Sequence, residues 1–122
     1  MGYRSEVAIT MYTKDYNKMI NRAQQLKDNS IYQTITSAEK WNTTDKKVTI
    51  LKFKSIKWYS EYKDIQWIEH FIQKINSYFI RIGEEYQDIE TYQYGDDYDL
   101  QNYSWISREI ALEDVINFER KI

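Results

Sequence analysis

The sequence has no cysteine, no proline and only three glycines. Without cysteine the chain forms no disulfide, no thiolate zinc site and no cysteine nucleophile, and a cytoplasmic location is the simplest expectation. With glycine only at Gly2, Gly83 and Gly95, no glycine-rich loop can hold a phosphate as P-loop and dinucleotide-binding proteins do. These absences argue against the common NTPases and dehydrogenases.

The chain also lacks long apolar runs and has a single histidine. No stretch approaches the roughly 20 apolar residues of a membrane span, and the first residues carry no signal-peptide pattern. His70 has no metal-ligand or triad partner at a recognised spacing. We therefore predict no membrane segment, no metal site, no cofactor and no catalytic residue, so that the protein is not an enzyme.

An ordinary globular composition is present, with an unusual share of tyrosine. The 122 residues are 42% hydrophobic and 30% charged, which predicts a single domain over residues 1–122 with its own core. The chain has 12 Tyr and 4 Trp but only 4 Phe. Because Tyr and Trp can bury a ring while a polar tip meets water or a partner, this excess suggests an interface. An AT-rich coding bias explains the excess equally well.

The first half of the chain shows two strand patterns and one helix pattern. Apolar residues alternate over residues 7–11, which predicts a strand. Residues 13–26 have apolar side chains at three- and four-residue steps, which predicts a helix capped by Thr13. Residues 31–44 fit a short helix and an irregular loop equally well. From 47 to 59 the alternation of β-branched and aromatic residues changes phase, which predicts a long strand with a bulge.

The second half contains the clearest helix. Residues 64–75 place one apolar stripe opposite a polar face that includes His70, and Asp64 is the predicted cap. Two strands of a hairpin follow, over 78–82 and 88–94, and residues 103–110 predict another strand before a tail of weak helical spacing. This order predicts an α+β fold: a single antiparallel or mixed sheet with two helices packed on one face, ferredoxin-like with extra C-terminal strands.

Basic and aromatic residues alternate within residues 52–59. This combination is typical of platforms for single-stranded nucleic acid, in which bases stack on rings while side chains such as Lys52, Lys54 and Lys57 follow the backbone. The formal net charge of −2 argues against that use, so direct nucleic-acid binding is not expected. In the favoured interpretation the lysines face water, and the core takes the apolar residues, namely Phe53, Ile56 and Trp58.

The stretch between Arg81 and Arg108 is strongly acidic, with seven carboxylates and no lysine or arginine. Tyrosines are distributed through it. Because carboxylates speed the encounter with a basic protein and aromatic rings supply much of the affinity, this combination predicts a partner-binding surface. A solvated acidic loop is the simpler alternative. We call the predicted surface the acidic tyrosine surface, and it consists of Glu84, Glu85, Asp88, Glu90, Tyr92, Tyr94, Asp96, Asp97, Tyr98, Asp99 and Tyr103.

Three parts of the chain carry a resemblance to other proteins. They are the opening Met1–Val7, Ile56–Tyr59 with Asp64–Gln66 after it, and Phe79–Glu84 with Asp88–Glu90 after it. In these parts the chain resembles a family of small uncharacterised bacteriophage and prophage proteins that open with a Met-Gly-Tyr-Arg-Ser-acidic-Val run. The resemblance touches most of the chain in patches. It implies a phage accessory protein in the cytoplasm of a bacterial host, and it brings no activity and no catalytic residues.

The resemblance and the acidic tyrosine surface lead to one functional hypothesis. We expect a non-enzymatic phage accessory protein that binds and inhibits a host nucleic-acid-handling defence protein, such as a CRISPR effector or another defence nuclease with a basic surface. The alternative is a small-ligand binding module, such as a sponge for a nucleotide signal, in which Trp58, Trp67 or a tyrosine stacks on the base. The sequence leaves the oligomeric state open.

Overall fold

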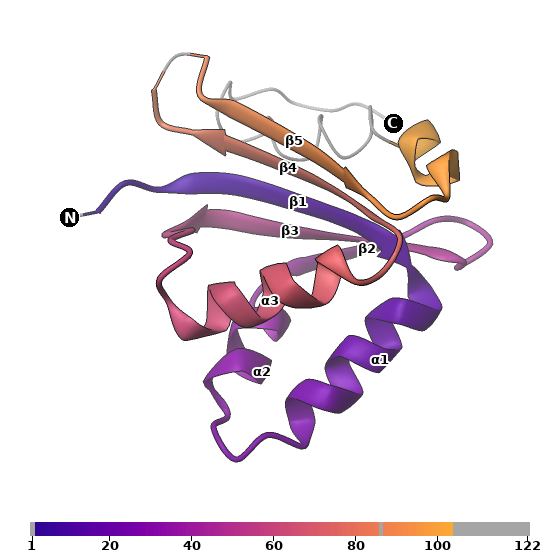
Figure 1. The fold of residues 1–122 in the computed structure, drawn as a ribbon, viewed down its shortest axis with the longest axis horizontal. Helices are drawn as coiled ribbons and strands as arrows, with labels where there is room; N and C mark the ends of the chain where they lie inside the picture. Colours follow the sequence, from indigo (N-terminus) through magenta and orange to yellow (C-terminus); the bar gives the residue numbers. More distant parts are fainter. Residues whose placement is uncertain (1, 86, 104–122) are drawn as a thin grey trace.

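The computed structural model describes residues 2–85 and 87–103, which form one sheet with helices on one side (Figure 1). β1 (Ser5–Tyr12) leads into α1 (Thr13–Gln24) and the short α2 (Ser30–Thr36). The described part continues with β2 (Glu39–Asn42), β3 (Val48–Ile56), α3 (Lys63–Gln73), β4 (Ser77–Gly83), β5 (Ile89–Tyr94) and the 3-10 helix η1 (Tyr98–Tyr103).

The five strands lie in the order β2-β3-β1-β4-β5, and each neighbouring pair is antiparallel. β1 therefore lies at the centre although it comes first in the chain. Helices connect β1 to β2 and β3 to β4, which gives the strand order of a ferredoxin-like domain, and β5 extends the sheet after the fourth strand. The predicted α+β fold is confirmed.

One face of the sheet packs against the helices and forms the main core (Figure 1). The alternation in β1 places Val7, Ile9 and Met11 on this face, where they are fully buried. Burial of each such side chain contributes roughly 1.5–3 kcal/mol to folding. The helices present their apolar sides to these strands, with Met19, Ala23, Ile65, Ile68, Phe71 and Ile72 among the buried residues.

The opposite face is also buried over the central strands. Ala8, Ile50, Ile80 and Ile82 form a second apolar cluster there. Lys52 pairs with Ala8 across β1 and β3, so it lies on this second face, and it is only 1% exposed. The expectation that the lysines of this strand face water is therefore wrong for Lys52.

Both predicted helix caps are wrong, because the two side chains make contacts between elements instead. Thr13 is the first residue of α1, and its hydroxyl lies 2.8 Å from the hydroxyl of Thr49 on β3. Asp64 lies inside α3, which begins at Lys63. The Asp64 carboxylate accepts a hydrogen bond of 2.6 Å from the Thr34 hydroxyl, so it joins α3 to α2.

Residues 31–44, which fit two interpretations in the sequence, contain parts of both kinds of element. They include most of α2, which has seven residues, and β2, which has four. β2 is exposed along its length, so it has no buried face to produce an alternating apolar pattern. With α2 included, the described part has three helices instead of the two predicted.

The predicted bulge in the long strand is confirmed. The register between β1 and β3 shifts between Ser5 and Val7, and on β3 the backbone of Ser55 has a φ of 50°. β3 ends at Ile56, three residues before the predicted end. Of the strand predicted over 103–110, only Tyr103 belongs to the described residues, where it ends η1, and the predicted tail lies outside them.

Candidate functional site

The hairpin between β4 and β5 holds a charged cluster of Tyr3, Arg81, Asp88 and Glu90, which we call the hairpin cluster. Arg81 contacts Asp88 Oδ1 through Nη2 and Glu90 Oε1 through Nε, both at 2.7 Å. The Tyr3 hydroxyl donates to Asp88 Oδ2 at 2.5 Å. The Arg81 guanidinium, and after it the Tyr3 hydroxyl, hold the pKa of Asp88 below its ordinary value. Two of the predicted partner-binding carboxylates are thus bound within the protein.

The first residues of the chain hold the same hairpin. The Arg4 backbone N–H donates to Glu84 Oε2 at 2.5 Å, and the Glu85 N–H donates to the Tyr3 hydroxyl at 2.9 Å. The Ser5 hydroxyl accepts a hydrogen bond from Arg81 Nη1. The charge count that predicted the acidic tyrosine surface began after Arg81, so it missed the cation that neutralises this end.

β5 carries the middle of the acidic tyrosine surface. Its register with β4 places Glu90, Tyr92 and Tyr94 on the face that the helices cover. The rings of Tyr92 and Tyr94 stack with centroids 6.1 Å apart, and Tyr92 also lies 6.0 Å from Phe79. Burial raises the pKa of Tyr94, whereas Tyr92 is 47% exposed. Tyr92 is therefore the ring of this pair that a partner can reach.

The segment after β5 presents Asp96, Asp97, Tyr98 and Asp99, which we call the aspartate turn. Asp97 is fixed on both carboxylate oxygens: Oδ1 accepts from the Asp99 N–H at 3.0 Å, and Oδ2 accepts from the Tyr12 hydroxyl at 2.7 Å. The Asp99 N–H, and after it the Tyr12 hydroxyl, hold the pKa of Asp97 below its ordinary value. Asp96, Tyr98 and Asp99 are exposed.

The aspartate turn is anchored next to the end of α3. Gly95 directly precedes the turn and has a φ of 86°, a conformation that favours glycine. Within the turn, the Asp97 N–H donates to Asn76 Oδ1 at 3.0 Å. A depression of about 490 Å³ lies beside the turn. The depression is lined by Gln73, Lys74, Asn76, Asp96 and Asp97. The turn is thus held by specific contacts, with two carboxylates beside a concave surface.

The acidic tyrosine surface is therefore divided into two ends. Asp88 of the hairpin cluster precedes the six-residue β5 and the aspartate turn follows it, so the strand separates them by about 17 Å. At the hairpin end Arg81 neutralises carboxylates, and Glu85 stays exposed. At the other end, no Lys or Arg within residues 2–85 and 87–103 lies at ion-pair distance from Asp96, Asp97 or Asp99. The carboxylates of the aspartate turn therefore form no ion pair within the described residues, although the Lys14 charge acts favourably on Asp97.

The basic and aromatic residues of β3 do not form a stacking platform. Phe53 and Trp58 lie in the main core with ring centroids 5.4 Å apart, and Trp58 Nε1 donates to Glu69 Oε2. The expectation that the core takes these two rings is confirmed. Trp58 is only 8% exposed, so the alternative hypothesis in which it stacks on a nucleotide base is not supported at this position.

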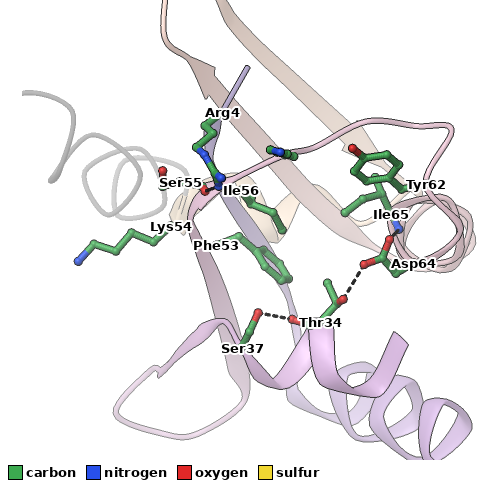
Figure 2. A pocket seen from close by; sticks show the side chains of 11 residues that line it. Arg4, Thr34, Ser37, Phe53, Lys54, Ser55, Ile56, Tyr62, Asp64 and Ile65 are labelled. Atoms are coloured by element: carbon green, nitrogen blue, oxygen red, sulfur yellow. Dashed lines mark hydrogen bonds between the residues drawn. The ribbon is translucent and has the colours of Figure 1, made fainter. Parts of the chain in front are cut away.

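A pocket of about 430 Å³ lies between β3, α2 and the start of α3 (Figure 2). Phe53 and Thr34 point toward it, whereas Lys54 points away (Figure 2). The polar groups around it bind one another: Thr34 donates to Asp64, and Ser37 donates to the Thr34 carbonyl at 2.6 Å. The first of these hydrogen bonds joins α2 to α3 and the second closes the end of α2, so both have a structural role.

Neither a membrane span nor a metal cluster is found in the described part of the chain. None of its helices is long and apolar enough to cross a membrane. None of its His, Asp and Glu side chains gather in groups of three or more that could hold a metal ion. Comparison of the chain with protein-family models, with curated proteins and with solved structures finds no match.

Proposed function

We propose that this protein is a non-enzymatic phage accessory protein that inhibits a host nucleic-acid-handling defence protein by binding its basic surface. The aspartate turn is the centre of the binding surface, and Tyr92 is its neighbour on β5. The observation that carries the proposal is the exposure of Asp96, Tyr98 and Asp99 with no lysine or arginine of the described residues at ion-pair distance from either carboxylate. Such charge is available to lysines and arginines of a partner.

The aromatic part of the surface supports a protein partner. Tyr98 is 62% exposed, which is unusual for a large ring and leaves an anchor beside two carboxylates. A tyrosine of this kind can fill a pocket in a partner and become a binding hot spot. The anchored backbone of the turn reduces the entropy that binding would cost, because Asp97 is already held by Tyr12 and Asn76.

The channels of nucleases are opposite in charge to the aspartate turn. Lys and Arg line such channels because they bind phosphates, and exposed carboxylates can occupy the same positions. The hairpin cluster contributes less, since its carboxylates are bound to Arg81. The phage-like pattern at the start of the chain supports the host and the class of partner, and the aspartate turn supports the mode of binding.

Affinity purification from host lysate, read by mass spectrometry, tests the proposal. The wild-type protein is expected to enrich a nucleic-acid-binding protein that an Asp96→Lys, Asp99→Lys variant does not. Asp97 is kept in this variant because it holds the turn together. The control variant is Glu61→Lys, which makes the same kind of charge reversal at one position. Glu61 is exposed and lies before α3, outside the surface. The proposal is overturned if the Asp96→Lys, Asp99→Lys variant enriches the partner as strongly as Glu61→Lys does, or if no basic partner is found at all.

A further inference from the structure

A second surface feature lies on the helix layer, in a groove of about 560 Å³ formed by the end of α1 and by α3. Its volume is within the range of roughly 300–1,000 Å³ typical of small-molecule sites. Both helices pack on the same face of the sheet (Figure 1). The lining residues that matter here are Arg22, Leu26, Trp67, His70, Phe71 and Lys74.

The charge of the groove is opposite to that of the whole chain. Arg22 and Lys74 are fixed cations, and His70 adds a polar ring, whereas no Asp or Glu lines the groove. The whole chain, in contrast, has 19 acidic and 17 basic residues. A concave surface with cations and no carboxylate attracts an anion.

The apolar side of the groove is flat and partly accessible. The Trp67 ring stacks on Phe71 with centroids 5.7 Å apart and an interplanar angle of 15°. Trp67 is half-buried, and Leu26 at the end of α1 is 38% exposed. An aromatic base can pack against such a surface, because it gains from contact with both rings and aliphatic groups.

Arg22 belongs to the cations of the groove and also contacts its aromatic side. Its guanidinium carbon lies 5.5 Å from the centroid of the Phe71 ring, so a cation–π contact holds it in place. A guanidinium that is already oriented loses less entropy when it binds a phosphate with two parallel hydrogen bonds. His70 on α3 and Lys74, directly after the helix, offer further donors.

We propose that this groove binds a nucleoside phosphate, with the base against Trp67 and Leu26 and the phosphate held by Arg22 and Lys74. This site lies on the helix layer and shares only Lys74 with the depression beside the aspartate turn, and the proposal goes beyond the binding of a basic protein. A nucleoside phosphate fits better than an acidic peptide because the cations lie next to one flat ring surface within a groove of small-molecule size. A peptide needs a longer row of contacts.

NMR titration of the ¹⁵N-labelled full chain with adenosine monophosphate tests the site. Amide signals of α1 and α3, and the indole N–H signal of Trp67, are expected to shift on binding. Adenosine alone and inorganic phosphate alone should each bind at least about tenfold more weakly, since each makes only half of the contacts. Hexaglutamate serves as the acidic-peptide probe, and stronger binding of hexaglutamate than of the nucleotide would overturn the proposal.

Matched variants assign the contacts. Arg22→Gln should weaken adenosine monophosphate binding about tenfold, because a charge-assisted hydrogen bond is lost. Lys18→Gln changes the net charge equally on the same helix, one turn earlier and outside the groove, and should keep the wild-type affinity. Leu26→Glu places a carboxylate on the exposed edge of the groove and should abolish binding while the fold persists. No spectral shift with the nucleotide, or equal effects of Arg22→Gln and Lys18→Gln, would refute the site, and neither result bears on the aspartate turn.

Discussion

The phenol of Tyr3 donates a 2.5 Å hydrogen bond to the carboxylate of Asp88, although 85 positions separate the two residues in the chain. Through this bond the segment before β1 becomes part of the β4–β5 hairpin. Gly83 lies at the same point, where an added Cβ would collide with the Asp88 carboxylate and the Tyr3 hydroxyl. The Tyr-Arg-Ser run at residues 3–5 is therefore a structural element of the hairpin.

Gly83→Ala should destabilise the fold by about 1–3 kcal/mol, because the added methyl group overpacks the hairpin cluster. The midpoint of urea unfolding, followed by far-UV circular dichroism, measures this loss. Combining Gly83→Ala with Tyr3→Phe removes one of the two colliding groups, so the double variant should lose less stability than the sum of the single variants. Strict additivity would show that the two residues are not in contact.

The unfolding free energy should fall in acid through Asp88. Its pKa is depressed in the folded state by Arg81 first and Tyr3 second, so its contribution is present above the unfolded value of about 3.9 and is lost as the pH falls through the folded value. Urea midpoints should therefore change little through this group between about pH 7 and 5 and should drop below about pH 4. Asp88→Asn should show a smaller acid drop than the wild type. Identical acid slopes for wild type and Asp88→Asn would contradict the assignment.

Ser55→Gly should stabilise the fold by up to about 1 kcal/mol, since Ser55 has a φ of 50°, where a side chain is strained and glycine is not. The hydrogen bond from the Ser55 N–H to Glu6 Oε2 uses the backbone and survives the change. Thermal or urea unfolding measures the gain. Ser55→Ala keeps a Cβ and should give no gain, so equal stability of the two variants would argue against strain at this bulge.

Binding to the basic partner should respond differently to salt and to loss of a ring. Raising salt from ~0.05 to ~0.5 M shortens the Debye length from about 14 to about 4 Å, which should slow association more than it speeds dissociation. Tyr98→Ala should instead raise the dissociation rate by about thirtyfold, as loss of an interface anchor does. Surface plasmon resonance separates the two rates. Association that does not depend on salt would mean that the aspartate turn is only a solvated surface.

Much of the fold could be predicted because its main elements have one buried face each. The alternation of Val7, Ile9 and Met11 and the apolar stripe of α3 are direct consequences of packing against a single core. β2 gave no such signal because all of its residues are exposed. The caps at Thr13 and Asp64 were predicted from local chemistry, but Thr49 and Thr34, distant in sequence, bind these side chains.

The candidate surface was predictable in composition but not in its division into two ends. Counting charges along residues 84–99 identifies the carboxylates. It does not show that Arg81 binds Asp88 and Glu90, or that the backbone before β1 binds Glu84. The sequence pointed to Trp67 as a ring that could stack on a base, but it gave no signal for the groove between α1 and α3 in which Trp67 lies. Arg22 and Trp67 are 45 positions apart, and only the packing of two helices brings them to one cavity.

The central position of β1 has a consequence for how the domain forms during synthesis. β1 pairs with β3 and β4, which are completed only at residues 56 and 83. A nascent chain that has emerged only as far as α2 therefore exposes both edges of a strand that is buried on both faces in the finished protein. One edge of β1 can pair only after residue 56 has left the ribosome and the other only after residue 83. Such nonlocal pairing slows folding and exposes strand edges to aggregation or chaperone capture.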